Sequence, residues 1–509
     1  MAKGILSVTA VAFLVVAATP ATALTLNPIA ATGSAAGGTG QTFTGFSAPK
    51  INDTGQTAFV GNTTPDSSGN DEGLFLGAPT GGTTTTAFEG DTAGGTGQTF
   101  TSFFDPQING AGQTAFLGFT TSDSSGNNEG VFLGAPTGGT ATIAFEGDAA
   151  GSTGQTFTLF NPPQINAAGQ TAFRGPTTPD SSGNNEGLFL GAPAGGTTTV
   201  AFEGDAAGGT GQTFFRFNAP QINDTGQTAF FGFTTPDGSF NDRGIFLGAP
   251  TGGTTTVAFE GDAAGGTGQT FTDFNAPQIN NAGQTAFFGS TTPDSSGNDR
   301  GVFLGALIGG TTTIAFEGDA AGGTGQTFTG FSGTNVEINA AGQTAFVGDT
   351  TPDSSGNDSG VFLGAPSGGT TTIAFEGDAA GSTGRTFTGF IGSDIEINDT
   401  GQVAFLASTA GGSGLFATDM MGNILDVLLF GDTVTDATGT QRIVSNILSF
   451  SLSDFGIAME VSFGGGGEGI FVAAFDQLEP VPLPPAAFML LAGLGGLAAF
   501  RRRAPRQTA

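Results

Sequence analysis

The strongest constraint on the fold is a pattern that returns seven times along the 509 residues. The pattern Asn-x-x-Gly-x-x-Ala-Phe begins at Asn52, Asn109, Asn166, Asn223, Asn280, Asn339 and Asn398. Successive copies are 57 residues apart four times and then 59 apart twice, and a degenerate eighth copy covers Ser453–Met459. Self-similarity at a fixed period of this length indicates a solenoid, a propeller or another repeat array, in which neighbouring units bury a shared core.

One repeat, residues 218–262, predicts short strands separated by turns. Asn223 and Gly226 occupy the first and fourth positions of a predicted β-turn between an extended segment, 218–222, and a strand, 227–231. Two further β-prone segments follow at 244–248 and 254–259, and no segment has a helical period. Four antiparallel strands per unit are typical of a propeller blade.

These copies match the NxxGxxAF tandem repeat, a family found on bacterial surface proteins. The match covers nearly the whole body of the chain and implies an exported repeat domain, with little implication for activity. The strand–turn–strand pattern also resembles TolB-type propeller repeats, in which a proline-bearing strand meets an Asp/Asn-Gly turn and then an Ala-Phe strand.

The two ends of the repeat region complement each other. Residues 24–46 align with the last strand of a unit and its following loop, whereas the degenerate eighth copy stops after its third strand, at 469–472. Seven complete units and one split unit make eight, and circular closure removes exposed sheet edges. The sequence therefore predicts an all-β, eight-bladed β-propeller with a split closing blade. The alternative is a β-solenoid or an open β-repeat array.

Composition excludes several kinds of chemistry. Cys, His, Trp and Tyr are absent, which leaves no thiol nucleophile, no Cys/His zinc site and no histidine base. A formal net charge of −31 disfavours nucleic acid as a partner. Fifty phenylalanines indicate a packed core rather than a disordered chain, and the recurring ones are expected to pack between blades: Phe59, Phe75, Phe88, Phe100 and Phe104.

Both ends of the chain carry predicted address signals. Residues 1–23 have a positive start at Lys3, an apolar run and a cleavage site of small residues, which is typical of a signal peptide. At the other end, a proline-rich segment precedes an apolar stretch and an arginine cluster. The predicted organisation is a signal peptide at 1–23, a β-repeat domain at 24–476, and a tail at 477–509 with a transmembrane segment at about 481–500.

The tail resembles the PEP-CTERM sorting signals of Gram-negative bacteria, in the variant written VPLPA. The residues that carry the resemblance are Val481, Pro482, Leu483, Pro484, Arg501, Arg502 and Arg503. Pro485 stands where that pattern has Ala. The resemblance implies an exosortase-type enzyme as a partner and membrane attachment through the C-terminal segment before processing. Loss of both ends would leave 7 basic and 43 acidic side chains, a charge of −36.

One acidic loop in each repeat is a weak candidate for calcium. In the first copy, oxygen-bearing side chains alternate at Asp66, Ser68, Asn70 and Glu72, as in calcium-binding loops. The last position becomes Arg243 and Arg300 in later copies, where a positive charge would repel the ion. A solvated turn without a cofactor is the main expectation, with calcium as the alternative.

Paired carboxylates also recur, as Glu-Gly-Asp after the fourth strand of each unit. The pairs are Glu89/Asp91, Glu146/Asp148, Glu203/Asp205, Glu260/Asp262, Glu317/Asp319 and Glu376/Asp378. A glycosidase needs one pair of carboxylates in different environments, and six copies of one pair do not single out a site. The acids that occur once and would be examined for catalysis are Asp394, Glu396, Asp426 and Asp436.

These observations predict a bacterial protein of the cell surface or extracellular matrix, exported by its signal peptide and anchored transiently or stably by its tail. The expected function is that of a non-catalytic scaffold, not an enzyme, whose acidic loops have binding or structural roles toward exopolysaccharide or other matrix components. The alternative is a propeller-based enzyme that acts on polysaccharide at the axis.

Overall fold

The computed structural model describes residues 24–306 and 310–475, apart from the side chains of 334–335 and 392–394. The chain divides into two compact units, Met1–Phe475 and Asp476–Ala509, and all described residues belong to the first. They form strands, turns and loops without a helix. No described segment is therefore a helix long and apolar enough to cross a membrane.

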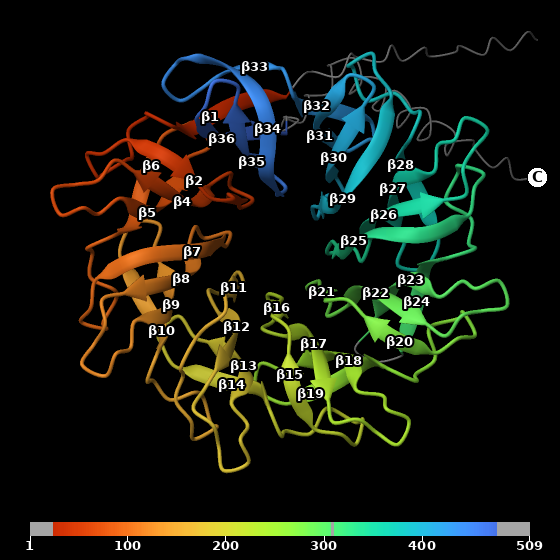
Figure 1. Ribbon diagram of the computed structural model, residues 1–509, viewed down its shortest axis with the longest axis horizontal. Helices are drawn as coiled ribbons and strands as arrows, with labels where there is room; N and C mark the ends of the chain where they lie inside the picture. Colours follow the sequence, from red (N-terminus) through yellow and green to blue (C-terminus); the bar gives the residue numbers. More distant parts are fainter. Residues whose placement is uncertain (1–23, 307–309, 476–509) are drawn as a thin grey trace, which may run out of the picture. The chain divides into compact units, whose positions relative to one another are not determined.

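Eight antiparallel sheets are arranged in a ring (Figure 1). Blade 1 contains β2 (Phe43–Phe46), β3 (Lys50–Ile51), β4 (Thr57–Thr63), β5 (Glu72–Gly77) and β6 (Thr83–Phe88). Blade 2 contains β7 (Phe100–Ile108), β8 (Thr114–Thr120), β9 (Glu129–Gly134) and β10 (Thr140–Phe145). Blade 3 contains β11 (Gln164–Ile165), β12 (Thr171–Pro176), β13 (Glu186–Gly191) and β14 (Thr197–Phe202). Blade 4 contains β15 (Phe214–Phe217), β16 (Gln221–Ile222), β17 (Thr228–Thr234), β18 (Arg243–Gly248) and β19 (Thr254–Phe259).

The second half of the ring follows the same order. Blade 5 contains β20 (Phe271–Phe274), β21 (Gln278–Ile279), β22 (Thr285–Thr291), β23 (Arg300–Gly305) and β24 (Thr311–Phe316). Blade 6 contains β25 (Phe328–Ile338), β26 (Thr344–Thr350), β27 (Ser359–Gly364) and β28 (Thr370–Phe375). Blade 7 contains β29 (Phe387–Ile397), β30 (Val403–Thr409), β31 (Gly412–Thr418) and β32 (Ile424–Leu429). Blade 8 contains β33 (Thr433–Thr435), β34 (Gln441–Leu452), β35 (Gly456–Phe463), β36 (Glu468–Ala474) and β1 (Thr25–Ala31).

The predicted closure of the ring is confirmed. Strand β1, from the start of the described chain, pairs antiparallel with β36, from its end, and the register runs from Thr25 opposite Ala474 to Ala31 opposite Gly469. The N-terminal strand β1 therefore completes blade 8 and covers the edge of β36. The architecture is an eight-bladed β-propeller with a split closing blade.

The repeated asparagine joins two blades. In blade 4, Oδ1 of Asn223 accepts hydrogen bonds from the N–H groups of Thr225 (3.1 Å) and Gln227 (2.9 Å), which fixes the predicted turn. Its Nδ2 donates to the carbonyl oxygen of Asn280 in blade 5, at 3.1 Å. Gly226 has φ of +78°, a conformation that favours glycine. Equivalent bonds link every blade from 1 to 8, ending with Asn398 and the carbonyl of Ser453.

The core lies between blades because the two faces of each strand differ. In β17, Ala229 and Phe230 are both fully buried but face opposite neighbours: Phe230 packs with Leu188 and Val200 of blade 3, and Ala229 packs with residues of blade 5. Burial of each phenylalanine contributes roughly 1.5–3 kcal/mol. The prediction that Phe104 packs in the core is wrong. It is 48% exposed, because Phe103 before it takes the inward-facing position of β7.

The innermost strand varies most between blades. In blade 4 it is split into β15 and β16, with Pro220 between them, and proline has no N–H with which to continue a ladder. Blades 6 and 7 have two extra residues and no proline here, and β25 and β29 each run for 11 residues with a shift in register. Figure 1 shows β11, β16, β21, β25 and β29 nearest the centre of the ring.

Candidate functional site

The acidic loop between the second and third strands of a blade binds its own backbone. Oδ1 of Asp66 accepts hydrogen bonds from the N–H groups of Ser68 (2.7 Å) and Asn70 (2.9 Å). Its Oδ2 accepts one from Nδ2 of Asn70 at 3.2 Å. These bonds, led by that from the Asn70 N–H, lower the pKa of Asp66. Three of the four calcium candidates, Asp66, Ser68 and Asn70, thus meet in one turn.

The fourth candidate, Glu72, contacts the next blade instead. Its Oε1 accepts hydrogen bonds from the N–H of Phe103 (2.6 Å) and the hydroxyl of Ser102 (2.8 Å) in blade 2. Glu129 and Glu186 accept the equivalent N–H of Phe160 (2.8 Å) and Phe217 (3.0 Å). Within the described part of the chain, no three acidic side chains are grouped so that they could hold a metal ion. Calcium binding at this loop stays a prediction.

The arginine that replaces this glutamate keeps the link between blades. Nη1 of Arg243 lies 3.0 Å from Oδ1 of Asp273 in blade 5. The same carboxylate accepts the N–H of Phe274 at 2.9 Å, which is the donor that a glutamate binds elsewhere. The acidic group has moved to the other side of the interface. At Arg243, the change from Glu to Arg therefore reflects blade packing.

The Glu-Gly-Asp carboxylates are acceptors for nearby backbone groups. Oε2 of Glu89 accepts hydrogen bonds from the N–H groups of Asp71 (2.6 Å) and Glu72 (3.2 Å), which ties the acidic loop to the end of β6. Oδ2 of Asp91 accepts the N–H of Phe88 at 2.9 Å. Burial raises the pKa of Glu89, against these hydrogen bonds. Each carboxylate of the pair has a separate structural role.

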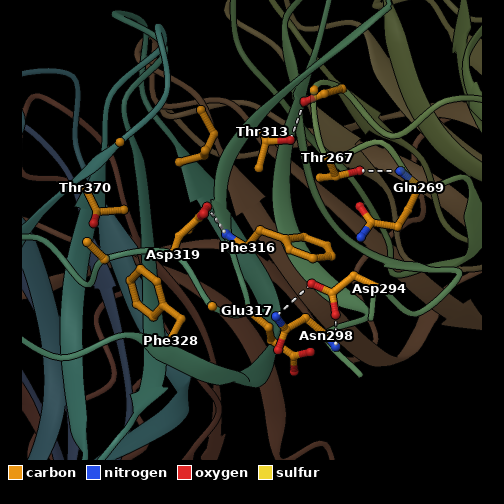
Figure 2. Close-up of a pocket in the computed structure, with 17 residues that line it drawn as sticks. Thr267, Gln269, Asp294, Asn298, Thr313, Phe316, Glu317, Asp319, Phe328 and Thr370 are labelled. Atoms are coloured by element: carbon orange, nitrogen blue, oxygen red, sulfur yellow. Dashed lines mark hydrogen bonds between the residues drawn. The ribbon is translucent and has the colours of Figure 1, made fainter. Parts of the chain in front are cut away.

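A polar groove occurs at two of the boundaries between successive blades. Between blades 5 and 6 it encloses about 680 Å³, and between blades 2 and 3 about 510 Å³. Figure 2 shows the first groove, with Thr267, Gln269 and Thr313 along one side and Asp294, Asn298 and Glu317 along the other. The residues of the second groove stand at the same repeat positions: Thr96, Gln98, Thr142, Asp123, Asn127 and Glu146.

This groove offers mainly hydrogen-bond acceptors. The carboxylates of Asp294 and Asp319 already accept backbone N–H groups but keep further lone pairs, whereas Oε1 of Gln269 is buried without a hydrogen-bond partner. Glycines form much of the remaining wall: Gly265, Gly266, Gly318 and Gly369. Backbone is consequently accessible there, and a ligand rich in hydroxyl donors matches the lining.

The residue before Ile-Asn on the innermost strand breaks the symmetry of the ring. It is glutamine in four blades but Lys50, Glu337 and Glu396 in blades 1, 6 and 7. Oε1 of Glu337 accepts a hydrogen bond from Nε2 of Gln278 at 3.2 Å, and Oε2 of Glu396 accepts the N–H of Leu452 at 2.5 Å. Burial, and then the charge of Glu396, raise the pKa of Glu337 to about 8, while Lys50 opposes this.

Sequence reasoning singled out Glu396 but missed Glu337. The signal was available, because an alignment of the repeats at the residue before Ile-Asn shows both replacements.

The structure does not bring together the other acids that occur once. Asp426 accepts hydrogen bonds from Ser382 at the outer strand β32, and Asp436 forms an ion pair with Arg442 at 3.0 Å in blade 8. The side chain of Asp394 is outside the described residues.

A smaller pocket lies on the face of the propeller where the asparagine turns meet. It encloses about 280 Å³ and includes Asp53, Asp399 and Asp454 from blades 1, 7 and 8. Burial raises the pKa of Asp454, and the charges of Asp53 and Asp399 add to this. The N–H of Asp454 donates to Oδ1 of Asp53 at 3.1 Å, which links blade 8 to blade 1.

The predicted sorting residues, Val481–Pro484 and Arg501–Arg503, and the segment at about 481–500 lie outside the described residues, as does the signal peptide at 1–23.

Comparison with known proteins gives one family and several distant structures. A family model described as "Family of unknown function (DUF7453)" matches residues 14–205 and 177–477. No curated protein matches the sequence.

Among solved structures, prolyl oligopeptidase B from Galerina marginata is 9% identical, with a TM-score of 0.40, over 82% of this chain and 55% of that one. The chain thus spans about half the length of that protein. TolB from Acinetobacter baumannii is 11% identical, with a TM-score of 0.29, over 73% of this chain and 79% of that one. The gluconolactonase XC5397 from Xanthomonas campestris is 11% identical, with a TM-score of 0.28, over 75% and 99% of the two chains.

Proposed function

The chain belongs to DUF7453, a family of unknown function, and we propose that it is an exported, non-catalytic scaffold that holds matrix polysaccharide in grooves repeated around the propeller. The observation that carries the proposal is the recurrence of the groove from equivalent residues at two blade boundaries, three repeats apart. A catalyst concentrates its chemistry in one place, whereas this lining is repeated. Repetition of weak sites on one rigid body raises the avidity for a polymer without any single strong contact.

The recurring carboxylates support a role without catalysis. Asp66, Glu72, Glu89 and Asp91 each accept hydrogen bonds from backbone N–H groups of the same blade or the next one. Groups held in this way stabilise loops. A general acid and a base, in contrast, need environments that separate their pKa values.

The grooves are tested by shortening one lining side chain in two of them. We expect the full chain to be retarded in a gel that contains hydroxyethylcellulose, a neutral polysaccharide. The double variant Gln98→Ala, Gln269→Ala should bind about threefold more weakly, because both amides line grooves. Gln441→Ala, at an exposed position of β34, is the matched control and should bind like the wild type. Equal retardation of the double variant and the wild type would contradict groove binding.

Export is the part of the proposal that rests on the sequence alone. The signal peptide at 1–23 and the sorting residues predict a mature chain that has lost both ends. Mass measurement of the protein extracted from the cell surface should show loss of residues beyond about Glu479. A mature surface form that retains Arg501–Arg503 would contradict processing of the tail.

A second candidate function is polysaccharide hydrolysis at the axis, which the pair Glu337 and Glu396 favours. Two carboxylates whose charges interact, one with a pKa raised to about 8, are a combination used for acid and base catalysis. This function predicts new reducing ends when polysaccharide is incubated with the full chain. Glu337→Gln and Glu396→Gln would each abolish the new reducing ends. Both variants should fold, because each restores the glutamine that four other blades carry.

A further inference from the structure

Two of the positions at which blade 4 departs from the repeat place a phenylalanine on the surface. Phe240 stands where five other blades have glycine: Gly69, Gly126, Gly183, Gly297 and Gly356. Phe215 stands where six other blades have threonine: Thr44, Thr101, Thr158, Thr272, Thr329 and Thr388. Neither change is required by the fold, because the other blades form the same strands and loops without it.

Phe240 occupies a backbone conformation that disfavours a side chain. Its φ is +66°, against +89° to +92° for the five equivalent glycines. A Cβ atom placed on each of those glycines meets no atom within 4 Å, so the phenylalanine gains no packing from the site. Phe240 is 83% exposed. Strain of this kind is retained where the surrounding structure or a function requires it, and here no contact within the blade explains it.

Phe215 belongs to an exposed aromatic group at the same end of the blade. Its neighbour Phe214 pairs with Thr234, which immediately precedes the loop that carries Phe240. Phe215 is 44% exposed, and its ring centroid lies 6.0 Å from that of Phe233. The guanidinium of Arg216 lies 5.8 Å from the Phe233 ring. No described carboxylate is within 4.0 Å of Arg216, so its N–H groups are available to a ligand.

A similar combination occurs in blade 2. Asp105 is the other non-glycine residue with positive φ among the described residues, at +45°. It follows Phe104, which is 48% exposed and lies 5.5 Å from Phe119 between ring centroids. The equivalents of Phe104 in the next three blades are asparagines, Asn161, Asn218 and Asn275. Both strained non-glycine positions therefore accompany an exposed phenylalanine.

We propose that the blade-4 surface, formed by Phe215, Arg216, Phe233 and Phe240, binds a neutral polysaccharide. Exposed rings fit the apolar C–H faces of sugar rings, and Arg216 with Asp237 and Asn241 of the loop supplies donors and acceptors for hydroxyl groups. A polyanion is disfavoured, because Asp242 and Asp273 already pair with Arg243, Asp237 lies in the same loop, and the chain has a net charge of −31. The inference rests on the proposed function and makes this surface the strongest of its sites.

Two substitutions that restore the repeat's own residues test the proposal. The variant Phe215→Thr, Phe240→Gly carries at both positions what other blades carry, so it should fold and its melting temperature should not fall. In gels that contain hydroxyethylcellulose, its dissociation constant should rise at least tenfold relative to the wild-type full chain. Ile443→Thr, which removes a 56% exposed apolar side chain from blade 8, is the matched control and should bind like the wild type.

The outcomes separate this inference from the proposed function. Equal binding of the double variant and the wild type would overturn the blade-4 surface and leave the grooves as binding sites. Retention by alginate, a polyanion, but not by hydroxyethylcellulose would overturn the ligand class. A concentration-dependent dimer that Phe240→Gly dissociates would show that the surface binds a second copy, and would overturn the inference too. Binding to no polysaccharide at all would overturn the proposed function as well.

Discussion

The asparagine that begins each repeat acts in two blades at once. Its Oδ1 fixes the turn within a blade, and this part could be predicted from Asn at the first and Gly at the fourth turn position. Its Nδ2 donates to the next blade across 57 or 59 residues of sequence. That bond could not be predicted from one repeat, because it depends on how successive blades are placed in the ring.

Glu337 makes a pH-dependent contribution to stability. Its pKa of about 8 in the folded chain lies above the ordinary value of 4.5. A raised acid pKa means that the folded state binds the proton more tightly than the unfolded state does. The stabilisation is complete below about pH 4.5 and is lost as the pH rises to about 8, and each unit of pKa difference corresponds to about 1.4 kcal/mol.

We therefore expect the free energy of unfolding of the wild type to fall between pH 5 and pH 8 relative to that of Glu337→Gln. Denaturant titrations at several pH values measure this difference. Glu396→Gln should reduce the slope in part, because the charge of Glu396 is the second cause of the raised pKa, while Lys50 opposes it. Parallel pH profiles for the wild type and Glu337→Gln would refute this account of the axial carboxylates.

At the scale of the strand, most elements could be predicted, since alternation and turn residues recur in every copy. The innermost strand could not be predicted in detail. It is split in blade 4, as β15 and β16, but it runs through Pro106 in blade 2 as the continuous strand β7, so a proline alone does not decide whether the strand splits. From the sequence alone, the Glu-to-Arg change at Arg243 is evidence only against calcium, because its partner Asp273 lies on another blade.

Packing between blades limits the residues that the third strand can carry. A Cβ atom on Gly248 of β18 would lie 2.1 Å from Cγ1 of Val200 in β14 and 2.5 Å from Oγ1 of Thr228 in β17. Gly248→Ala should therefore destabilise the propeller by about 1–3 kcal/mol, which is typical of overpacking. Chemical denaturation measures the change in the free energy of unfolding.

The neighbour and an unrelated glycine supply the controls. In Val200→Ala, the additional cost of Gly248→Ala should be smaller, because the close methyl group is gone. Gly110→Ala should have an effect within about 0.5 kcal/mol, since nothing lies within 4 Å of its Cβ position and blade 3 carries Ala167 there. Additive effects of Gly248→Ala and Val200→Ala would show that the two blades are not coupled at this contact.

For the molecule as a whole, the ring could be predicted because the two ends of the chain each hold part of one blade. A chain that lacks Leu24–Gly33 should lose β1 and expose β36 as a sheet edge, which invites aggregation. Light scattering should then increase with protein concentration, and a synthetic peptide of Leu24–Gly33 added in excess should suppress the increase. A truncated chain that stays monomeric and as stable as the intact one would show that closure by β1 is dispensable.

Function could be predicted less far than the fold. The fold could be predicted because the same pattern of strands and turns recurs in each copy. The proposed binding sites, in contrast, depend on residues that differ from the repeat, such as Phe240, and on grooves between blades. The sequence identified carboxylates, but their roles as backbone acceptors follow from the positions of neighbouring loops and blades, as for Glu72 and Phe103.

The central claim, a scaffold with several binding sites and no catalysis, is tested most directly by calorimetric titration of the full chain with cellohexaose, followed by sizing of the sugar. The account predicts saturable binding of more than one equivalent per chain and recovery of the oligosaccharide at its original length. Binding of a single equivalent, or shortening of the sugar that Glu337→Gln or Glu396→Gln abolishes, would contradict it.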